Sequence, residues 1–176
     1  MSKNSCVIYA PIDTLSGYGS RARDTVKSII ELKKDEWDIK LISCPWGNTP
    51  SGFINENPEW HFLIKHMLTH QLNYQPDIFI WITIPPEFQK AGKYNIGITA
   101  GLETNIIPGD WIEGVNRMDL VLVSSEHSKK AFLNSKFQKI NDKTKQVESL
   151  LEIKTPVEVI FEGVSTEVYQ HIEWIN

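Results

Sequence analysis

An acidic residue and a hydroxyl, Glu103 and Thr104, stand shortly after an apolar run that ends at Thr99. In a parallel sheet the segments that follow strands gather at one edge, where ligands bind. A carboxylate there can accept hydrogen bonds from substrate hydroxyls or take a proton as a general base. The alternative is that Glu103 caps a helix or forms a salt bridge that organises the loop before Trp111, itself interpreted as a packing anchor. The sequence makes Glu103 a candidate catalytic residue and Thr104 a candidate binding residue.

A glycine-containing loop follows the first apolar run and precedes a segment with helical periodicity. Its candidate ligand-binding residues are Gly17, Tyr18, Gly19, Ser20 and Arg21. Glycines let backbone amides approach an anion, and the positive end of a helix that begins near Ser20 favours a phosphate. Arg21 and Arg23 would stand in the first helical turn, where cations are unfavourable unless a bound anion compensates their charge. These features predict a phosphate site; the alternative is a plain turn whose arginines both point into solvent.

The spacing Gly17-x-Gly19-x-x-Ala22 fits a dinucleotide fingerprint only superficially. That motif needs its first glycine directly after the strand and an acidic residue at the end of the second strand. In this chain residues 11–16 intervene before the first glycine, and the second apolar run ends at Cys44. We therefore do not predict NAD or FAD as a cofactor.

Two histidines, His66 and His70, are spaced four residues apart and would share one helical face with Glu59, as zinc ligands can. No glutamate stands inside the histidine pair, and no fourth ligand is evident. A solvated face of an amphipathic helix explains these residues better, and we interpret His127 as a surface residue. No metal site is predicted, and catalysis independent of a divalent metal is expected because no Asp-x-Asp follows a strand.

Length, charge and cysteine usage limit the class of protein. The 176 residues are enough for one domain with a sizeable core. A net charge of −4 gives no field that would attract a polyanion, so nucleic acid is not indicated as a partner. No export signal is visible, and no apolar run approaches the roughly 20 residues that span a bilayer. Cys6 and Cys44 are interpreted as reduced core residues, and we expect a cytoplasmic protein without a membrane span.

Apolar runs alternate with helix-like segments along the chain. The predicted strands cover residues 6–10, 38–44, 78–82, 95–99, 120–124 and 157–161. The run 78–82 is apolar without alternation, as expected of a strand covered on both faces, and we place it near the centre of the sheet. Alternating strands and helices imply right-handed crossovers. The predicted fold class is α/β, a Rossmann-like open parallel sheet of about six strands with helices on both faces.

One predicted helix lies between the second and third strands. Asn57 followed by Pro58 is a good helix start, because Asn can cap the free amides and Pro has no amide to leave unpaired. The apolar face of this helix would run to Leu72. Residues 45–57 before it contain several prolines and glycines and are expected to form a mobile surface loop.

The later connections are predicted in the same way. Asn116 and Asp119 are interpreted as residues that fix the turn into the fifth strand. A helix follows that strand, capped by Ser124 or Ser125. Residues 134–155 are polar and rich in lysine, and we expect a helix or a linker there.

Two longer runs carry a family resemblance. The first is Asn95-Ile-Gly-Ile-Thr-Ala-Gly-Leu-Glu103-Thr104, followed by Pro108, Trp111, Asn116, Asp119 and Leu120-Val-Leu-Val-Ser124-Ser125. The second is Pro156-Val-Glu-Val-Ile-Phe-Glu162-Gly163-Val164-Ser-Thr166. With the Gly17 loop, they resemble the N-terminal, acceptor-side half of a GT-B glycosyltransferase, similar to the large retaining group common in bacteria and phages. Phe161 stands where that group commonly has proline, and Ser165 where it commonly has aspartate.

The resemblance implies roles for the candidate residues and for partners. Residues 1–169 would form one Rossmann-like GT-B domain, and residues 170–176 the start of an interdomain connection or a tail. Glu103 would act on the acceptor, and the Gly17 loop with Thr104 would contact the donor's diphosphate or the acceptor. The donor would be a nucleotide sugar, the acceptor is unidentified, and no separate cofactor is implied. A second Rossmann-like domain, in cis or in trans, would hold the donor's base and sugar.

That second domain has no counterpart in the 176 residues. We therefore expect a truncated piece, one half of a split enzyme, or a domain without catalysis, and no turnover from this half alone. In a complete enzyme, Gly19→Val is expected to abolish turnover while leaving folding largely intact. Two other functions stay open: a non-catalytic module that binds a glycan, nucleotide or protein partner, and an unrelated nucleotide-binding Rossmann protein.

Overall fold

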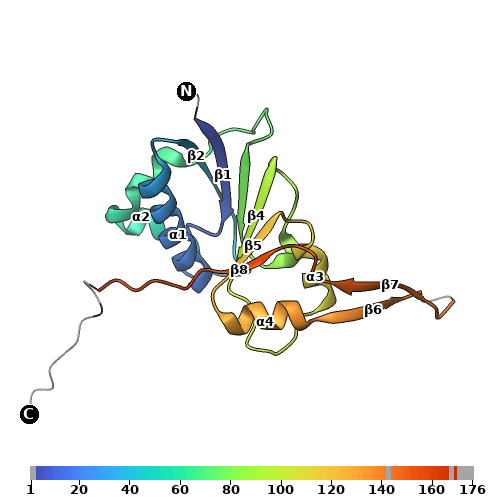
Figure 1. Ribbon diagram of the computed structural model, residues 1–176. Helices are drawn as coiled ribbons and strands as arrows, with labels where there is room; N and C mark the ends of the chain where they lie inside the picture. The colour runs from blue at the N-terminus through green and yellow to red at the C-terminus, as the bar shows by residue number, and fades with distance from the viewer. Residues whose placement is uncertain (1–2, 142–143, 167–168, 170–176) are drawn as a thin grey trace, which may run out of the picture.

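The computed structural model describes residues 3–141, 144–166 and 169 (Figure 1). The strands are β1 (Asn4–Ala10), β2 (Trp37–Ser43), β3 (Ile78–Ile82), β4 (Tyr94–Thr99), β5 (Leu120–Val123), β6 (Lys136–Ile140), β7 (Val147–Glu152) and β8 (Val157–Val159). The helices are α1 (Gly17–Lys33), α2 (Phe53–Glu56), α3 (Gly109–Val115) and α4 (Glu126–Asn134), with 3₁₀ helices η1 (Pro58–His66) and η2 (Pro85–Glu87). The predicted segment 170–176 lies outside the described residues.

The main sheet has six strands in the order β2-β1-β3-β4-β5-β8, and each neighbouring pair is parallel. This confirms the predicted α/β class with an open parallel sheet of six strands. β3 is the third strand of the six, so its place near the centre is also confirmed. The chain steps from β1 outward to β2 and then back past β1 to β3, which reverses the direction of winding between β1 and β3.

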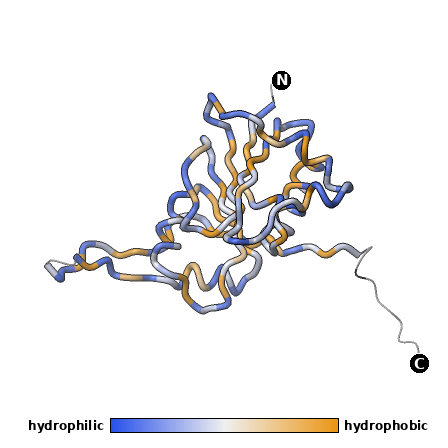
Figure 2. The backbone as a smooth tube through the Cα atoms, turned by 180° about the vertical axis from the view of Figure 1, so that it is seen from behind, coloured by the Kyte–Doolittle hydropathy of each residue, from blue (hydrophilic) through white to orange (hydrophobic). Residues whose placement is uncertain are grey.

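Helices cover both faces of this sheet, as predicted (Figure 1). On one face α1, α2 and η1 pack on a core that includes Ile8, Val26 and Leu63. On the other face α3 and α4 contribute to a second core that includes Val121 and Phe132. The hydrophobic stretches lie mainly along the central strands, and the outer loops are mostly hydrophilic (Figure 2). Among the described residues, no helix is long and apolar enough to cross a bilayer.

The helix predicted from Asn57 is shorter than expected. Pro58 is its first residue, as predicted, but η1 is a 3₁₀ helix that ends at His66. The backbone of Met67 is extended, and the amide of Leu68 donates to the carbonyl of Leu41 at 2.8 Å, so the chain runs beside the outer edge of β2. The prediction of a helical face reaching Leu72 is therefore wrong.

The segment before this helix also differs from the prediction. The residues expected to form a mobile loop include the short helix α2. The side chain of Asn57 does not cap the following helix, because its Nδ2 donates to the carbonyl of Phe53 at 2.7 Å. Asn57 instead closes the end of α2.

Residues 134–155 do not form a helix or a plain linker. They contain β6 and β7, an antiparallel hairpin that projects from the body of the molecule (Figure 1). Phe137 pairs with Leu151, and both pack against the second core. The rest of the hairpin is largely exposed, including Leu150 at 53%. The absence of an apolar period in the sequence reflects this exposure.

Two carboxylates, Asp119 and Asp77, connect the starts of neighbouring strands. Asp119 Oδ2 accepts from the backbone amide and the Nδ2 of Asn95, at 2.7 and 3.2 Å. Asp119 thus fixes the start of β5 against β4, as predicted. The predicted partner Asn116 does something else: its Nδ2 donates to the carbonyl of Glu152 at 2.8 Å and holds the end of β7. Lys93 and hydrogen bonds from Ser5 hold the pKa of Asp77 well below its usual range, at the start of β3.

Candidate functional site at the carboxyl edge of the sheet

The candidate residues gather at the edge where the parallel strands end, called here the carboxyl edge. In open α/β sheets ligands bind outside the carboxyl ends of the strands, at the point where the winding reverses. In this chain that point lies between β1 and β3. The connections that follow β1 and β4 carry the predicted glycine loop and Glu103, respectively. Their arrangement decides what the edge can bind.

Helix α1 begins at Gly17, three residues before the predicted start near Ser20. Ser16 caps it: its Oγ accepts from the amide of Gly19 at 2.9 Å, and its carbonyl accepts from the amide of Ser20 at 2.9 Å. Two of the four predicted anion-binding amides are therefore occupied. Those of Gly17 and Tyr18 have no hydrogen-bond partner among the described residues, so they remain available to a ligand at the positive end of the helix.

Gly19 serves packing rather than ligand binding. A Cβ at this position would lie 2.3 Å from the backbone oxygen of Thr14 and 3.0 Å from that of Pro11. A backbone contact this short cannot be relieved by turning a side chain. Contrary to the expectation from the sequence, Gly19→Val should therefore disturb folding. A Cβ on Gly17 would meet no heavy atom within 4 Å.

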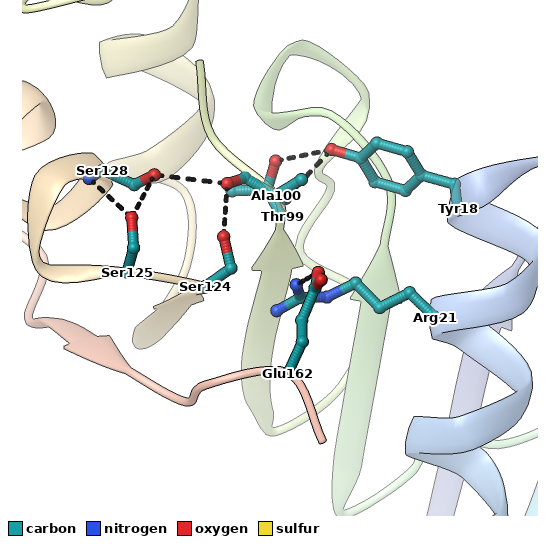
Figure 3. A network of polar contacts seen from close by, with 8 residues as sticks. All are labelled: Tyr18, Arg21, Thr99, Ala100, Ser124, Ser125, Ser128 and Glu162. Carbon is teal, nitrogen blue, oxygen red and sulfur yellow. Dashed lines mark hydrogen bonds and ion pairs between the residues drawn. The ribbon is translucent and has the colours of Figure 1, made fainter. Parts of the chain in front are cut away.

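Tyr18 connects the start of α1 to the end of β4 (Figure 3). Its hydroxyl lies 2.9 Å from the hydroxyl of Thr99 and accepts from the amide of Ala100 at 3.1 Å. Its ring stacks on Trp46, with ring centroids 4.1 Å apart. The side chain of Tyr18 is thus engaged in structure, and its backbone amide is the part that a ligand can use.

Serines hold the same residue, Ala100, through its carbonyl. The carbonyl of Ala100 accepts from the Oγ atoms of Ser124 and Ser128, at 2.8 and 3.3 Å (Figure 3). Ser125 caps α4 by accepting from the amide of Ser128 at 3.1 Å, so of the two predicted caps it is Ser125 that does so. Gly101 follows with a φ of 86°, a conformation that favours glycine. The loop after β4 therefore leaves the sheet from a fixed point.

Glu103 and Thr104 lie in this loop and are exposed. Thr104 Oγ1 donates to the carbonyl of Ile106 at 2.6 Å, which shapes the loop. Glu103 makes no hydrogen bond or ion pair with any residue that the structure describes. Helix α3 begins after Pro108 without a side-chain cap. The alternative role for Glu103, as a cap or a salt-bridge partner, is therefore not found in the described part of the chain.

Trp111 is a packing anchor, as predicted. Its side chain is 8% exposed and lies edge-on to Phe132, with ring centroids 5.9 Å apart. Beside the same loop lies a mostly apolar cleft of about 280 Å³. It is lined by Leu102, Thr104, Ile106, Ile107, Pro108 and Phe137.

The two arginines of α1 have different surroundings, and neither simply points into solvent. Arg21 forms an ion pair from Nη1 to Oε1 of Glu162, in the segment that follows β8 (Figure 3). The Arg21 side chain is 11% exposed, and its buried Nε has no hydrogen-bond partner among the described residues. Sequence reasoning singled out Arg21 but not this partner, 141 residues away.

Arg23 is a structural residue at 4% exposure. Its Nη1 donates to the carbonyls of Ile12 and Thr14, at 3.0 and 2.9 Å, and its guanidinium lies 3.4 Å from the centroid of the Phe53 ring. Burial lowers the pKa of this guanidinium. Arg23 thus holds the loop after β1 from inside.

The sequence did not lead us to predict a role for Asp13, which organises the loop after β1. Its carboxylate accepts from the backbone amides of Gly52 and Ile54, at 3.0 and 2.8 Å, and so ties α2 to the loop after β1. An acidic residue in the loop after the first strand is the signal that would have pointed to it. A cleft of about 170 Å³ lies beside it, lined also by Ser43, Ile54, Asn55, Ile64 and Met67.

The histidines do not share a helical face. His66 Nδ1 lies 3.0 Å from the carbonyl oxygen of Ile39, whereas His70 lies beyond the end of η1. His127 is exposed, as predicted. In the part of the chain that the structure describes, no three His, Cys, Asp or Glu side chains are placed to hold a metal ion together.

Comparison of the chain with protein-family models, with curated proteins and with solved structures found no match. Any functional conclusion therefore rests on the residues and on the geometry of the carboxyl edge.

Proposed function

We propose that this chain is the N-terminal, acceptor-side half of a nucleotide-sugar-dependent glycosyltransferase of the GT-B type. The observation that carries the proposal is Arg21, a nearly buried guanidinium in the first turns of α1, close in sequence to the unpartnered amides of Gly17 and Tyr18. A guanidinium and free amides at a helix start suit the oxygens of a diphosphate. Glu103, exposed after β4, supports a role toward an acceptor at the same edge.

Each group has a role in the proposed reaction. The amides of Gly17 and Tyr18 and the side chain of Arg21 bind the donor's diphosphate and offset the charge that develops as it leaves. Glu103 accepts a hydrogen bond or a proton from the acceptor hydroxyl. Thr104 shapes the loop that presents Glu103, through its bond to Ile106. A second Rossmann-like domain, in the same chain or in a partner, holds the base and sugar of the donor.

The affinity for the donor tests whether this chain contacts only the diphosphate and a second domain holds the base and sugar. Since the chain supplies only diphosphate contacts, its 176 residues should bind nucleotide sugars with no better than about millimolar affinity, equivalent to ~4 kcal/mol, and should not turn them over. Calorimetry with a panel of nucleotide sugars measures this. Arg21→Ala should abolish the weak binding, whereas Lys27→Ala, which removes an exposed charge further along α1, should retain it. Micromolar binding, or turnover without a partner, would contradict the division into halves.

Glu103 is tested by activity. In the enzyme with both domains, Glu103→Gln should lower kcat by on the order of 10²-fold, because the amide cannot take the acceptor's proton. The melting temperature should not change, since Glu103 is exposed and makes no hydrogen bond or ion pair with a described residue. Glu31→Gln, an exposed position toward the other end of α1, is the matched control. Normal specific activity in the folded Glu103→Gln protein, together with lower stability, would contradict the catalytic role and assign this residue to the organisation of the loop.

A further inference from the structure

The segment that follows β8, residues 160–164, crosses toward α1 and is called here the closing segment (Figure 1). It starts beside β5, where the amide of Ile160 donates to the carbonyl of Val123 at 2.9 Å. It then runs without regular structure to the start of α1, where Glu162 pairs with Arg21 (Figure 3). β8 is the strand at one end of the sheet, whereas α1 connects β1 and β2, the two strands at the other end. The closing segment therefore passes along the carboxyl edge.

Few features of the closing segment secure it to the body of the protein. Phe161 and Val164 are 70% and 65% exposed, so hydrophobic packing contributes little. The Glu162 side chain is 59% exposed, against 11% for Arg21. Ion pairs with one exposed member are weak, typically worth no more than a few-fold in an equilibrium constant. The attachment to α1 is thus easily reversed.

The guanidinium of Arg21 is incompletely used in this arrangement. Glu162 engages Nη1, whereas the buried Nε has no partner among the described residues. A guanidinium presents a planar fork of N–H donors that matches two oxygens of a phosphate or carboxylate. The Nε–H lies on the same side of the guanidinium as Nη2, and phosphate oxygens can engage that pair of donors, whereas Glu162 engages Nη1 and leaves Nε unused.

We propose that Glu162 is a built-in competitor that occupies the anion site of Arg21 until a phosphate-containing ligand displaces it and releases the closing segment. This inference rests on the proposed function in one respect, the use of Arg21 to bind a diphosphate. It adds that the site is closed when empty and opens on binding. Binding of the ligand to Arg21 and release of Glu162 then occur together.

The test uses inorganic pyrophosphate as the probe and the full 176-residue chain. Calorimetry at low ionic strength should show Glu162→Gln binding pyrophosphate about five-fold more tightly than the unmodified chain, the factor that loss of one weak competing ion pair allows. Glu158→Gln is the matched control: Glu158 pairs with Lys129 at 2.8 Å, so the same charge is removed without freeing Arg21. Its affinity should stay unchanged. Arg21→Ala should lose binding with or without Glu162→Gln.

A second measurement follows the closing segment itself. Backbone ¹⁵N relaxation should show residues 161–164 gaining motion when pyrophosphate is added, and already mobile without ligand in Glu162→Gln. Equal affinity of the unmodified and Glu162→Gln chains, absence of pyrophosphate binding in both, or unchanged order in residues 161–164 would each overturn the inference. If Glu162→Gln tightens pyrophosphate binding but no nucleotide sugar binds, the inference stands and the proposed function fails.

Discussion

Replacement of Gly19 by alanine is expected to lower the free energy of unfolding by about 2–4 kcal/mol, because the new methyl group meets backbone that cannot move independently. A Cβ at this position would lie 2.3 Å from the carbonyl oxygen of Thr14 and 2.7 Å from its Oγ1. That hydroxyl donates to the carbonyl of Pro11 at 2.8 Å, so a shift would also disturb the loop after β1. For a chain of this size the melting temperature should fall by roughly 5–15 °C.

Gly17→Ala is the matched control for this change. It is the same substitution two residues earlier in the same helix, and its Cβ meets nothing within 4 Å. Alanine also restricts the unfolded chain and favours the helix, so stability should be unchanged or slightly higher. Urea denaturation of both variants measures the difference. Equal stability of the two variants would show that α1 can move away from the loop after β1, and would contradict a packing role for Gly19.

Replacement of Arg23 by alanine is expected to cost about 3 kcal/mol of unfolding free energy, since it leaves two buried carbonyls without a donor. These are the carbonyls of Ile12 and Thr14, which Arg23 Nη1 reaches at 3.0 and 2.9 Å. The contact with the Phe53 ring, at 3.4 Å from its centroid, is lost as well.

Arg21→Ala provides the comparison. Arg21 pairs with the exposed Glu162, so its removal should change stability by less than about 1 kcal/mol while abolishing anion binding. Denaturation and pyrophosphate titration on the two variants separate the roles. A larger loss of stability from Arg21→Ala than from Arg23→Ala would reverse the assignment of one arginine to the ligand and the other to the loop.

These expected results share one physical picture of the carboxyl edge. Gly19 and Arg23 fix the loop after β1 to α1, and Tyr18 fixes α1 to the end of β4. Most of the polar groups that the sequence predicted as ligand contacts form hydrogen bonds or ion pairs within the protein. Among the described candidate residues, the amides of Gly17 and Tyr18 and the carboxylate of Glu103 have no partner within the protein, and Arg21 has only the exposed Glu162.

The strands of the main sheet could be predicted from the sequence because their signal is local. A strand covered on both faces must be apolar along its whole length, and the run Ile78–Ile82 is the clearest case. The sequence limited the predicted cap of α4 to two serines for a similar reason, because a capping side chain bonds to an amide within the same turn. Alternation of such elements then limited the fold to an open parallel sheet.

The β6–β7 hairpin could not be predicted because its stabilising contacts are not local. Most of its residues face solvent, so no apolar period marks them, and the pairing of Phe137 with Leu151 joins residues well separated along the chain. The end of η1 is a similar case. The apolar spacing suits a longer helix, but a hydrogen bond from Leu68 to Leu41 holds the chain extended at the edge of β2.

The sequence by itself determined the strands of the main sheet, the edge where the candidate residues meet, and the chemical types present there. Only the tertiary structure decided which of these residues hold the protein together and which lie at the carboxyl edge. Arg21 and Arg23 are both cations near the start of one helix, yet one faces Glu162 at the carboxyl edge and the other is buried against Phe53. The physical reason is that a helix turns by about 100° per residue, so two positions apart on α1 point to opposite sides. Which side meets the loop after β1 and which meets the carboxyl edge depends on how α1 packs on the sheet.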